Sequence, residues 1–224
     1  MLAFVDTIHT KPSAVALATW HQEQDSYLQG RYGEATSEGW KGCMVGCLAE
    51  GKNHSKFPEL FGIDTGIAHL SDKFFENITD YKSWPVKLIS SVKEGIDTTN
   101  AWYRFMHWML MDNQHGVVKV KDSPEIRAVG KLFERAIAGD MSTAQQWRDA
   151  SNAAADAAYA AAAAAADAAA ADAANAAAAA ADAAYAVYAA NAAANAANAA
   201  NAATRKRHYE IMADKLCYFL GGGV

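Results

Sequence analysis

The sequence predicts an all-α protein, with a compact helical domain followed by long alanine-rich helices that pack as a hairpin or against a partner chain. Two observations predict this fold class. Apolar residues recur at helical spacing through the first part of the chain, and alanine dominates residues 153–203, where helical propensity is high throughout. We therefore expect an aromatic-rich helical domain over 1–150, an alanine-rich helical segment over 151–203, and a C-terminal helix over 204–224 that docks on the core.

The first domain carries a start signal for each of its expected helices. One helix opens at Lys11, next to a proline, and a short apolar helix follows over 40–49. Asp64 is placed to cap the next helix, and Ser83 precedes another. The helix over 101–111 has aromatic and methionine residues around its whole circumference, so it is expected to lie in the core.

The signals after this core helix are more mixed. Residues 117–120 alternate valine with lysine, which is compatible with a short strand or with a turn. Ser123 and the proline after it predict a helix that ends near Gly139. Residues 142–145 have the pattern of a capping box and lead into the alanine tract.

The alanine tract cannot form a core on its own. A single helix of this length would extend about 75 Å and would present little apolar area per turn. Alanine faces allow close helix approach, so the tract is expected to fold back as a hairpin, to lie along the first domain, or to pair with a second chain. A homodimer through these helices is the predicted assembly.

Composition excludes several classes of partner. With 25 acidic against 20 basic residues the net charge is −5, which gives no general attraction to duplex nucleic acid. Aspartates interrupt the alanine tract, so no membrane span is expected. The N-terminus lacks the pattern of a signal peptide and the cysteines are three in number, which favours a cytoplasmic protein with reduced thiols.

A glycine-rich region provides the first group of candidate ligand-binding residues. Glycines and a lysine near a helix start can offer backbone N–H groups and positive charge to a phosphate, although Walker spacing is absent. Alternatively, Gly42 and Gly46 permit a close helix crossing. The candidates in this region are Arg31, Tyr32, Trp40, Lys41, Gly42, His54 and Lys56.

A second candidate group lies on the predicted core helix. Arg104, His107 and Trp108 fall on or near one helical face. An arginine beside aromatic rings can hold a nucleotide base or a phosphate by stacking and charge. The alternative is that these three residues lie at the edge of the core and have their hydrogen bonds satisfied within the protein, with no ligand.

The cysteines and histidines suggest weaker alternatives. Cys43 and Cys47 share one helical face and His54 and His69 follow, but their spacing matches no zinc signature, so neither a metal nor a cofactor is predicted. Buried, inert thiols are expected, with a thiol nucleophile assisted by His54 as an alternative. Acidic side chains four residues apart are expected to face solvent rather than a metal, namely Asp72, Glu76 and Asp80.

Two segments and the tail carry a resemblance to known sequences. The run WKGCMVGC from Trp40, the run HSKFPELF from His54, and an alanine tract ending in MADKL resemble a group of uncharacterised phage and bacterial proteins over most of the chain. The tails of that group carry arginine and tryptophan where this tail has aspartate, asparagine and tyrosine. The resemblance implies a phage setting, in the cytoplasm of an infected bacterial host.

The leading functional hypothesis is a non-enzymatic protein that binds and sequesters a small nucleotide immune signal, an anti-defence role that needs no catalytic residues. One alternative is a structural or protein-binding role for the alanine-rich helices. A second alternative is an enzyme that degrades the same signal, for which His54 and His107 are the candidate general bases.

Overall fold

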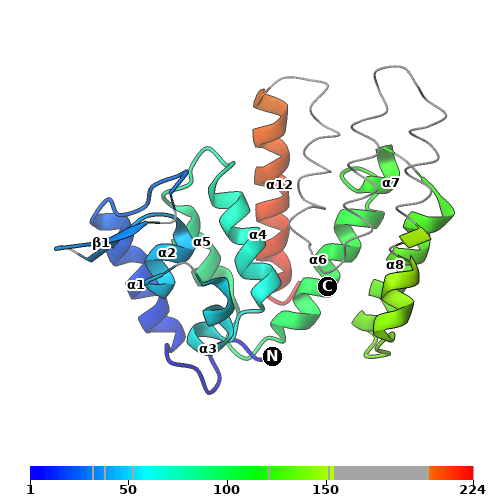
Figure 1. Cartoon of the computed structure of the whole chain (residues 1–224), viewed down its shortest axis with the longest axis horizontal. Coiled ribbons are helices and arrows are strands. Elements are labelled where there is room, and N and C mark those ends of the chain that lie inside the picture. The colour runs from blue at the N-terminus through cyan, green and yellow to red at the C-terminus, as the bar shows by residue number, and fades with distance from the viewer. Residues whose placement is uncertain are drawn as a thin grey trace. The chain divides into compact units, whose positions relative to one another are not determined.

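The computed structural model is predominantly helical, which confirms the helical part of the predicted fold class (Figure 1). It describes residues 1–31, 33–37, 39–51, 53–120, 122–150, 152–153 and 202–223. Within these residues the chain divides into two compact units, which we call unit 1 (Met1–Trp102 with Tyr209–Val224) and unit 2 (Tyr103–His208). The predicted alanine-rich hairpin, its packing against a partner and the homodimer through it fall almost wholly outside the described residues.

Unit 1 holds most of the short elements. They are α1 (Lys11–Glu23), β1 (Glu34–Thr36), β2 (Gly39–Lys41), α2 (Met44–Ala49), the 3-10 helix η1 (His54–Lys56), α3 (Phe57–Phe61), α4 (Thr65–Phe75) and α5 (Trp84–Ser91), with the start of α6 (Thr98–Met111) and the end of α12 (Ala202–Leu220). Helix α1 packs against α5 and α2, and α4 packs against α2, α3, α5 and η1.

Side-chain caps set the starts of two long helices in unit 1. The hydroxyl of Thr10 accepts a hydrogen bond from the Ser13 amide at the start of α1. The carboxylate of Asp64 accepts from the Gly66 amide at 2.8 Å, as the sequence predicted for α4. Each cap satisfies an N–H group that has no partner inside its helix.

The segment over 40–49 is not one helix, and this corrects the sequence prediction. Trp40 lies in the antiparallel pair of β1 and β2, opposite Ala35, and α2 begins only at Met44. Two glycines take backbone angles that other residues rarely adopt, with φ of 104° at Gly33 and 108° at Gly39. The two glycines lie just before β1 and at the start of β2, and a helix of six residues, α2, follows this hairpin.

The core of unit 1 is aromatic and includes the end of α12. Trp84 is 1% exposed, packs edge to face on Phe74, and donates its indole N–H to the Ser71 carbonyl at 2.9 Å. Tyr209 of α12 also packs edge to face on Phe74. Leu216 and Leu220 of the same helix are fully buried.

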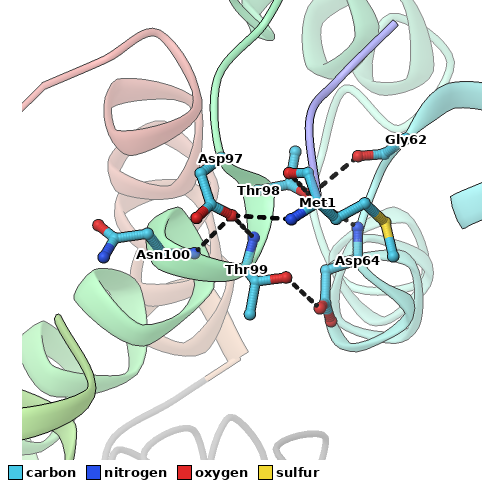
Figure 2. A network of polar contacts seen from close by, with 7 residues as sticks. All are labelled: Met1, Gly62, Asp64, Asp97, Thr98, Thr99 and Asn100. Atoms are coloured by element: carbon cyan, nitrogen blue, oxygen red, sulfur yellow. Dashed lines mark hydrogen bonds and ion pairs between the residues drawn. The ribbon is translucent and has the colours of Figure 1, made fainter. Parts of the chain in front are cut away.

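The first turn of α6 is held by a network of polar contacts around its cap (Figure 2). Asp97 accepts from the Thr99 amide at 3.0 Å and pairs with the amino group of Met1 at 3.2 Å. Thr98 donates its hydroxyl hydrogen to the Gly62 carbonyl, and Thr99 donates to the Asp64 carboxylate. Asp97, the residue before Thr98, therefore caps α6.

Unit 2 contains the rest of α6, α7 (Val117–Val120), α8 (Pro124–Ile137), a helical stretch over 144–150 and the beginning of α12. The valines over 117–120 form one helical turn, so the strand alternative is wrong. Ser123 caps α8 as predicted. Thr143 and Gln146 exchange hydrogen bonds in a reciprocal capping box, one residue later than expected.

Helix α6 is largely buried, as predicted for the 101–111 segment. Its buried side chains are Ala101, Trp102, Phe105, Met106, Met109 and Leu110. Trp108, by contrast, is only half-buried. Across the described part of the chain, no helix combines the length and the apolar character needed to cross a bilayer.

Candidate functional site

The glycine-rich region that was predicted to cradle a phosphate uses its backbone N–H groups internally. The Gly42 amide donates to the Ser26 carbonyl at 2.9 Å, and the Cys43 amide donates to the Arg31 carbonyl at 2.8 Å. The Gly46 amide donates to the Cys43 sulfur at 3.4 Å. An amide bonded in this way has no donor left for a ligand, so these three amides are not available to the predicted phosphate cradle.

One amide of the same region already holds an anion from the protein itself. The Gly30 N–H donates to a carboxylate oxygen of Glu76 at 2.7 Å. Burial raises the pKa of Glu76, and this hydrogen bond acts in the opposite direction. Glu76 is therefore half-buried and hydrogen-bonded to the Gly30 amide, which corrects the expectation that its side chain faces solvent.

The side chains proposed for this region lie at different depths. Arg31 and Lys56 are exposed, Trp40 and Lys41 on β2 are half-buried, and Gly42 is buried. Tyr32 lies outside the described residues. Among these candidates, His54 belongs to a cluster of polar side chains. The other residues of that cluster were not in the predicted site.

His54 is paired with Asp72 of α4. The side chain of Asn53 accepts a hydrogen bond from the Ser55 amide and starts η1, which contacts α4. In this arrangement His54 Nε2 lies 3.3 Å from Asp72 Oδ2, and the two side chains are 11% and 16% exposed. The pair is thus shielded from water far more than an ordinary surface ion pair.

His69 adds a second imidazole to this pair. Its ring stacks on the His54 ring with centroids 4.0 Å apart and planes at 14°. His69 and Asp72 are three residues apart on α4, which puts them on one face of the helix. Burial lowers the pKa of His69, and the charge of His54 lowers it further, while Asp72 opposes both.

Cys43 completes what we call the Asp72 cluster, formed by Cys43, His54, His69 and Asp72. The thiol is 2% exposed and hydrogen-bonds the Asp72 carboxylate. Burial first, and then the negative charge of Asp72, raise the pKa of Cys43 to about 12. Asp72 Oδ1 is buried and has no hydrogen-bond partner among the described residues.

The thiols of Cys43, the N-cap residue of α2, and of Cys47 within α2 are poor nucleophiles in this setting. Burial also raises the pKa of Cys47 to about 12, and its sulfur lies 3.6 Å from the carbonyl oxygens of Ser26 and Gly42. Because the thiolate is the reactive form, Cys43 is better described as a donor to Asp72 than as a nucleophile activated by His54. Within the described residues no three histidine, cysteine or acidic side chains are arranged to hold a metal ion.

The second predicted group belongs to unit 2. Arg104, His107 and Trp108 are all half-buried on α6. His107 Nε2 lies 3.2 Å from a carboxylate oxygen of Glu134. The Trp108 ring lies against His115, with centroids 6.0 Å apart.

Sequence reasoning missed the residues that give the Asp72 cluster its character. His69 was considered only as a zinc ligand, and Asp72 was assigned to solvent. The spacing of these two residues on one predicted helix was a visible signal. The approach of His54, 18 residues before Asp72 and on another element, was not visible.

No family model, no curated protein and no solved structure matches this chain.

Proposed function

We propose that unit 1 catalyses an acid–base reaction, in which His54 and His69 transfer protons and Asp72 positions His54. The observation that carries the proposal is a pair of imidazoles stacked at 4.0 Å, one of them held by a largely buried carboxylate. Burying a carboxylate is costly, and perturbed, partly shielded ionisable groups concentrate at functional sites.

The geometry suggests a different task for each imidazole. The hydrogen bond to Asp72 keeps a proton on His54 Nε2, so Nδ1 is the atom that exchanges protons with a ligand. His69 is exposed, and its lowered pKa leaves it uncharged at neutral pH, which suits it to accept a proton. We assign His69 as the general base and His54 as the general acid.

The proposed substrate is a phosphodiester of a nucleotide-like signal, the ligand class indicated by the sequence. Lys56 of η1 and Lys73 of α4 are close in sequence to His54 and Asp72, and such lysines carry the positive charge that attracts a phosphate. The resemblance described above implies an infected bacterial cell as the setting of this activity.

The reaction proceeds by hydrolysis. His69 takes a proton from water while the water oxygen forms a bond to phosphorus. The bond from phosphorus to the leaving oxygen breaks, and this oxygen keeps the electron pair and receives a proton from His54 Nδ1. Both imidazoles regain their starting charge by exchanging protons with solvent.

The experiment is a turnover assay of the purified full chain with cyclic oligonucleotides and ADP-ribose derivatives, followed by mass spectrometry of the ligand. His54→Gln and His69→Gln are each expected to slow consumption by about 100-fold or more. His107→Gln is the matched control, because it removes a histidine of similar carboxylate pairing from unit 2.

The outcomes separate the remaining hypotheses. Consumption that survives both unit 1 substitutions would contradict the assigned roles. Tight binding with intact ligand released after denaturation would contradict the enzyme and support sequestration. A chain that neither binds nor consumes any of these ligands would favour the protein-binding alternative.

A further inference from the structure

The loop over residues 28–31 is fixed at both ends to the start of α2. The Leu28 amide donates to the Gly42 carbonyl, and the Arg31 carbonyl accepts from the Cys43 amide, both at 2.8 Å. Cys43 is the N-cap residue of α2 and a member of the Asp72 cluster. The main chain of Arg31 therefore lies at the edge of that cluster.

The middle of the same loop is fixed to the end of α4. The Gln29 side chain donates to the Phe75 carbonyl, and the Gly30 amide donates to a carboxylate oxygen of Glu76, both at 2.7 Å. Phe75 is the last residue of α4, where carbonyl groups lack a partner inside the helix. Glu76 lies one helical turn after Asp72. The loop thus joins α2 to α4 beside the Asp72 cluster.

The Arg31 side chain is exposed, although its main chain is held on both sides. A loop that is fixed before a ligand arrives has already met part of the entropic cost of binding. A guanidinium keeps its positive charge at all relevant pH values and can donate to two phosphate oxygens at once. An arginine held in this way is suited to bind a phosphate at the cluster.

The charges on α4 explain why a substrate phosphate would need such a cation. His69, Asp72 and Glu76 follow one another at helical spacing, so they share one face at the end of α4. His69 is the exposed imidazole of the cluster and marks the side from which a ligand can reach it. The two carboxylates on this face repel an approaching phosphate. A neighbouring positive charge offsets that repulsion.

We propose that Arg31 binds the phosphate group of the substrate at the Asp72 cluster, and that Glu76 positions Arg31 by holding the Gly30 amide. The guanidinium donates to the non-bridging phosphate oxygens, which leaves the attacking water to His69 and the leaving oxygen to His54. Glu76 acts through the loop and touches no substrate. This inference rests on the proposed function, because it names the residue that binds the substrate of that reaction.

The test has a binding arm and a turnover arm, both with the full chain. Calorimetry with cyclic di-AMP measures binding in the His69→Gln background, where the probe is not consumed. Arg31→Gln is expected to weaken this binding by about tenfold, the loss of a charged hydrogen bond. Turnover of bis(p-nitrophenyl) phosphate by the chain with His69 intact should show a KM that Arg31→Gln raises more than it lowers kcat.

Further variants separate position from charge. Arg31→Lys keeps the charge without the paired donors and should recover part of the binding. Glu76→Ala should bind cyclic di-AMP about fivefold more weakly than Glu76→Gln, because both lose the carboxylate charge and only glutamine keeps an acceptor for the Gly30 amide. This difference should vanish when Arg31 is already glutamine, which a general loss of stability would not produce.

Lys93→Gln is the matched control for charge. It removes an exposed lysine of unit 1 whose amide donates to Leu220 at the end of α12, and it should leave binding unchanged. Equal weakening by Lys93→Gln would reduce the effect of Arg31 to general charge attraction and overturn the inference. Equal binding by Glu76→Ala and Glu76→Gln would overturn the positioning role of Glu76.

The two arms distinguish this inference from the proposed function. Turnover that Arg31→Gln leaves unaffected would overturn the inference and keep the acid–base reaction. Binding that depends on Arg31, in a chain that turns over no phosphodiester, would support Arg31 as the phosphate-binding residue and overturn the reaction. A chain that neither binds nor turns over the two probes would overturn both.

Discussion

Two histidine–carboxylate pairs of nearly equal length occur in different surroundings. His54 lies 3.3 Å from Asp72 in unit 1, and His107 lies 3.2 Å from Glu134 in unit 2. The first pair is 11% and 16% exposed, whereas the second is 29% and 59% exposed. The N–O distance alone does not distinguish the two pairs. Shielding from water, the stacked His69 and the Cys43 thiol distinguish the first pair as a candidate site.

The largest expected contrast between the two pairs is in turnover. Asp72→Asn keeps the shape of the side chain but no longer holds the proton on His54 Nε2, so the rate should fall on the order of 100-fold. Glu134→Gln makes the same chemical change in the other pair and should leave the rate unchanged. Steady-state rates over pH 5–9 test this, and rate losses of equal size would remove the distinction.

A smaller contrast is expected in stability. Asp72→Ala leaves the His54 ring and the Cys43 thiol largely buried without their acceptor, which should cost about 1–3 kcal/mol in the free energy of unfolding. Glu134→Ala breaks an exposed pair and should cost about 0–1 kcal/mol. Urea unfolding of both variants measures the difference, and a stabilised Asp72→Ala protein would show that the buried carboxylate is a net burden.

The pH dependence of stability extends the comparison to other shielded histidines. His21 is 2% exposed, and burial lowers its pKa more than the Cys47 carbonyl and the Glu50 carboxylate raise it. The unfolded chain therefore binds the proton more readily. The neutral His21 side chain contributes its full stabilisation above pH 6.5, the pKa of histidine in the unfolded chain. This contribution is lost as the pH falls through the lower pKa of His21 in the folded protein.

The pKa values of His69 and His208 are also lowered, so they contribute with the same sign. Unfolding in urea between pH 7.5 and 5 should show stability falling toward acid. Replacing His21 by Phe should flatten part of that slope. An unaltered slope in the His21 variant would mean that other groups control the acid response.

The smallest expected effect concerns salt. A double-mutant cycle on His107 and Glu134 should give a coupling of about 0.5 kcal/mol or less, and 1 M NaCl should reduce it further because exposed charges are screened. The same cycle on His54 and Asp72 should depend less on salt. Equal sensitivity of the two cycles would mean that water reaches both pairs alike.

The sequence predicted elements whose signals are local. Asp64 and Ser123 cap their helices as expected, because a cap is decided by a few consecutive residues. The hairpin of β1 and β2 was missed, since three-residue strands carry too little periodicity to be recognised. The valines over 117–120 alternated like a strand and formed a helical turn, which four residues cannot decide.

The candidate sites were harder to predict because they are tertiary. His54 could be named, but its partner Asp72 comes from α4 and was assigned to solvent. Contacts between segments that are distant in the sequence leave no local pattern from which they could be predicted.

The buried sulfurs of α2 give this protein an internal reporter of its own opening motions. A thiol reagent can reach Cys43 and Cys47 only when unit 1 opens locally, because both are at most 2% exposed. Cys217 on α12 is half-buried and offers a faster reference reaction in the same molecule. Labelling kinetics of the unmodified chain would therefore measure how often the Asp72 cluster becomes accessible, and whether a bound ligand makes that opening rarer.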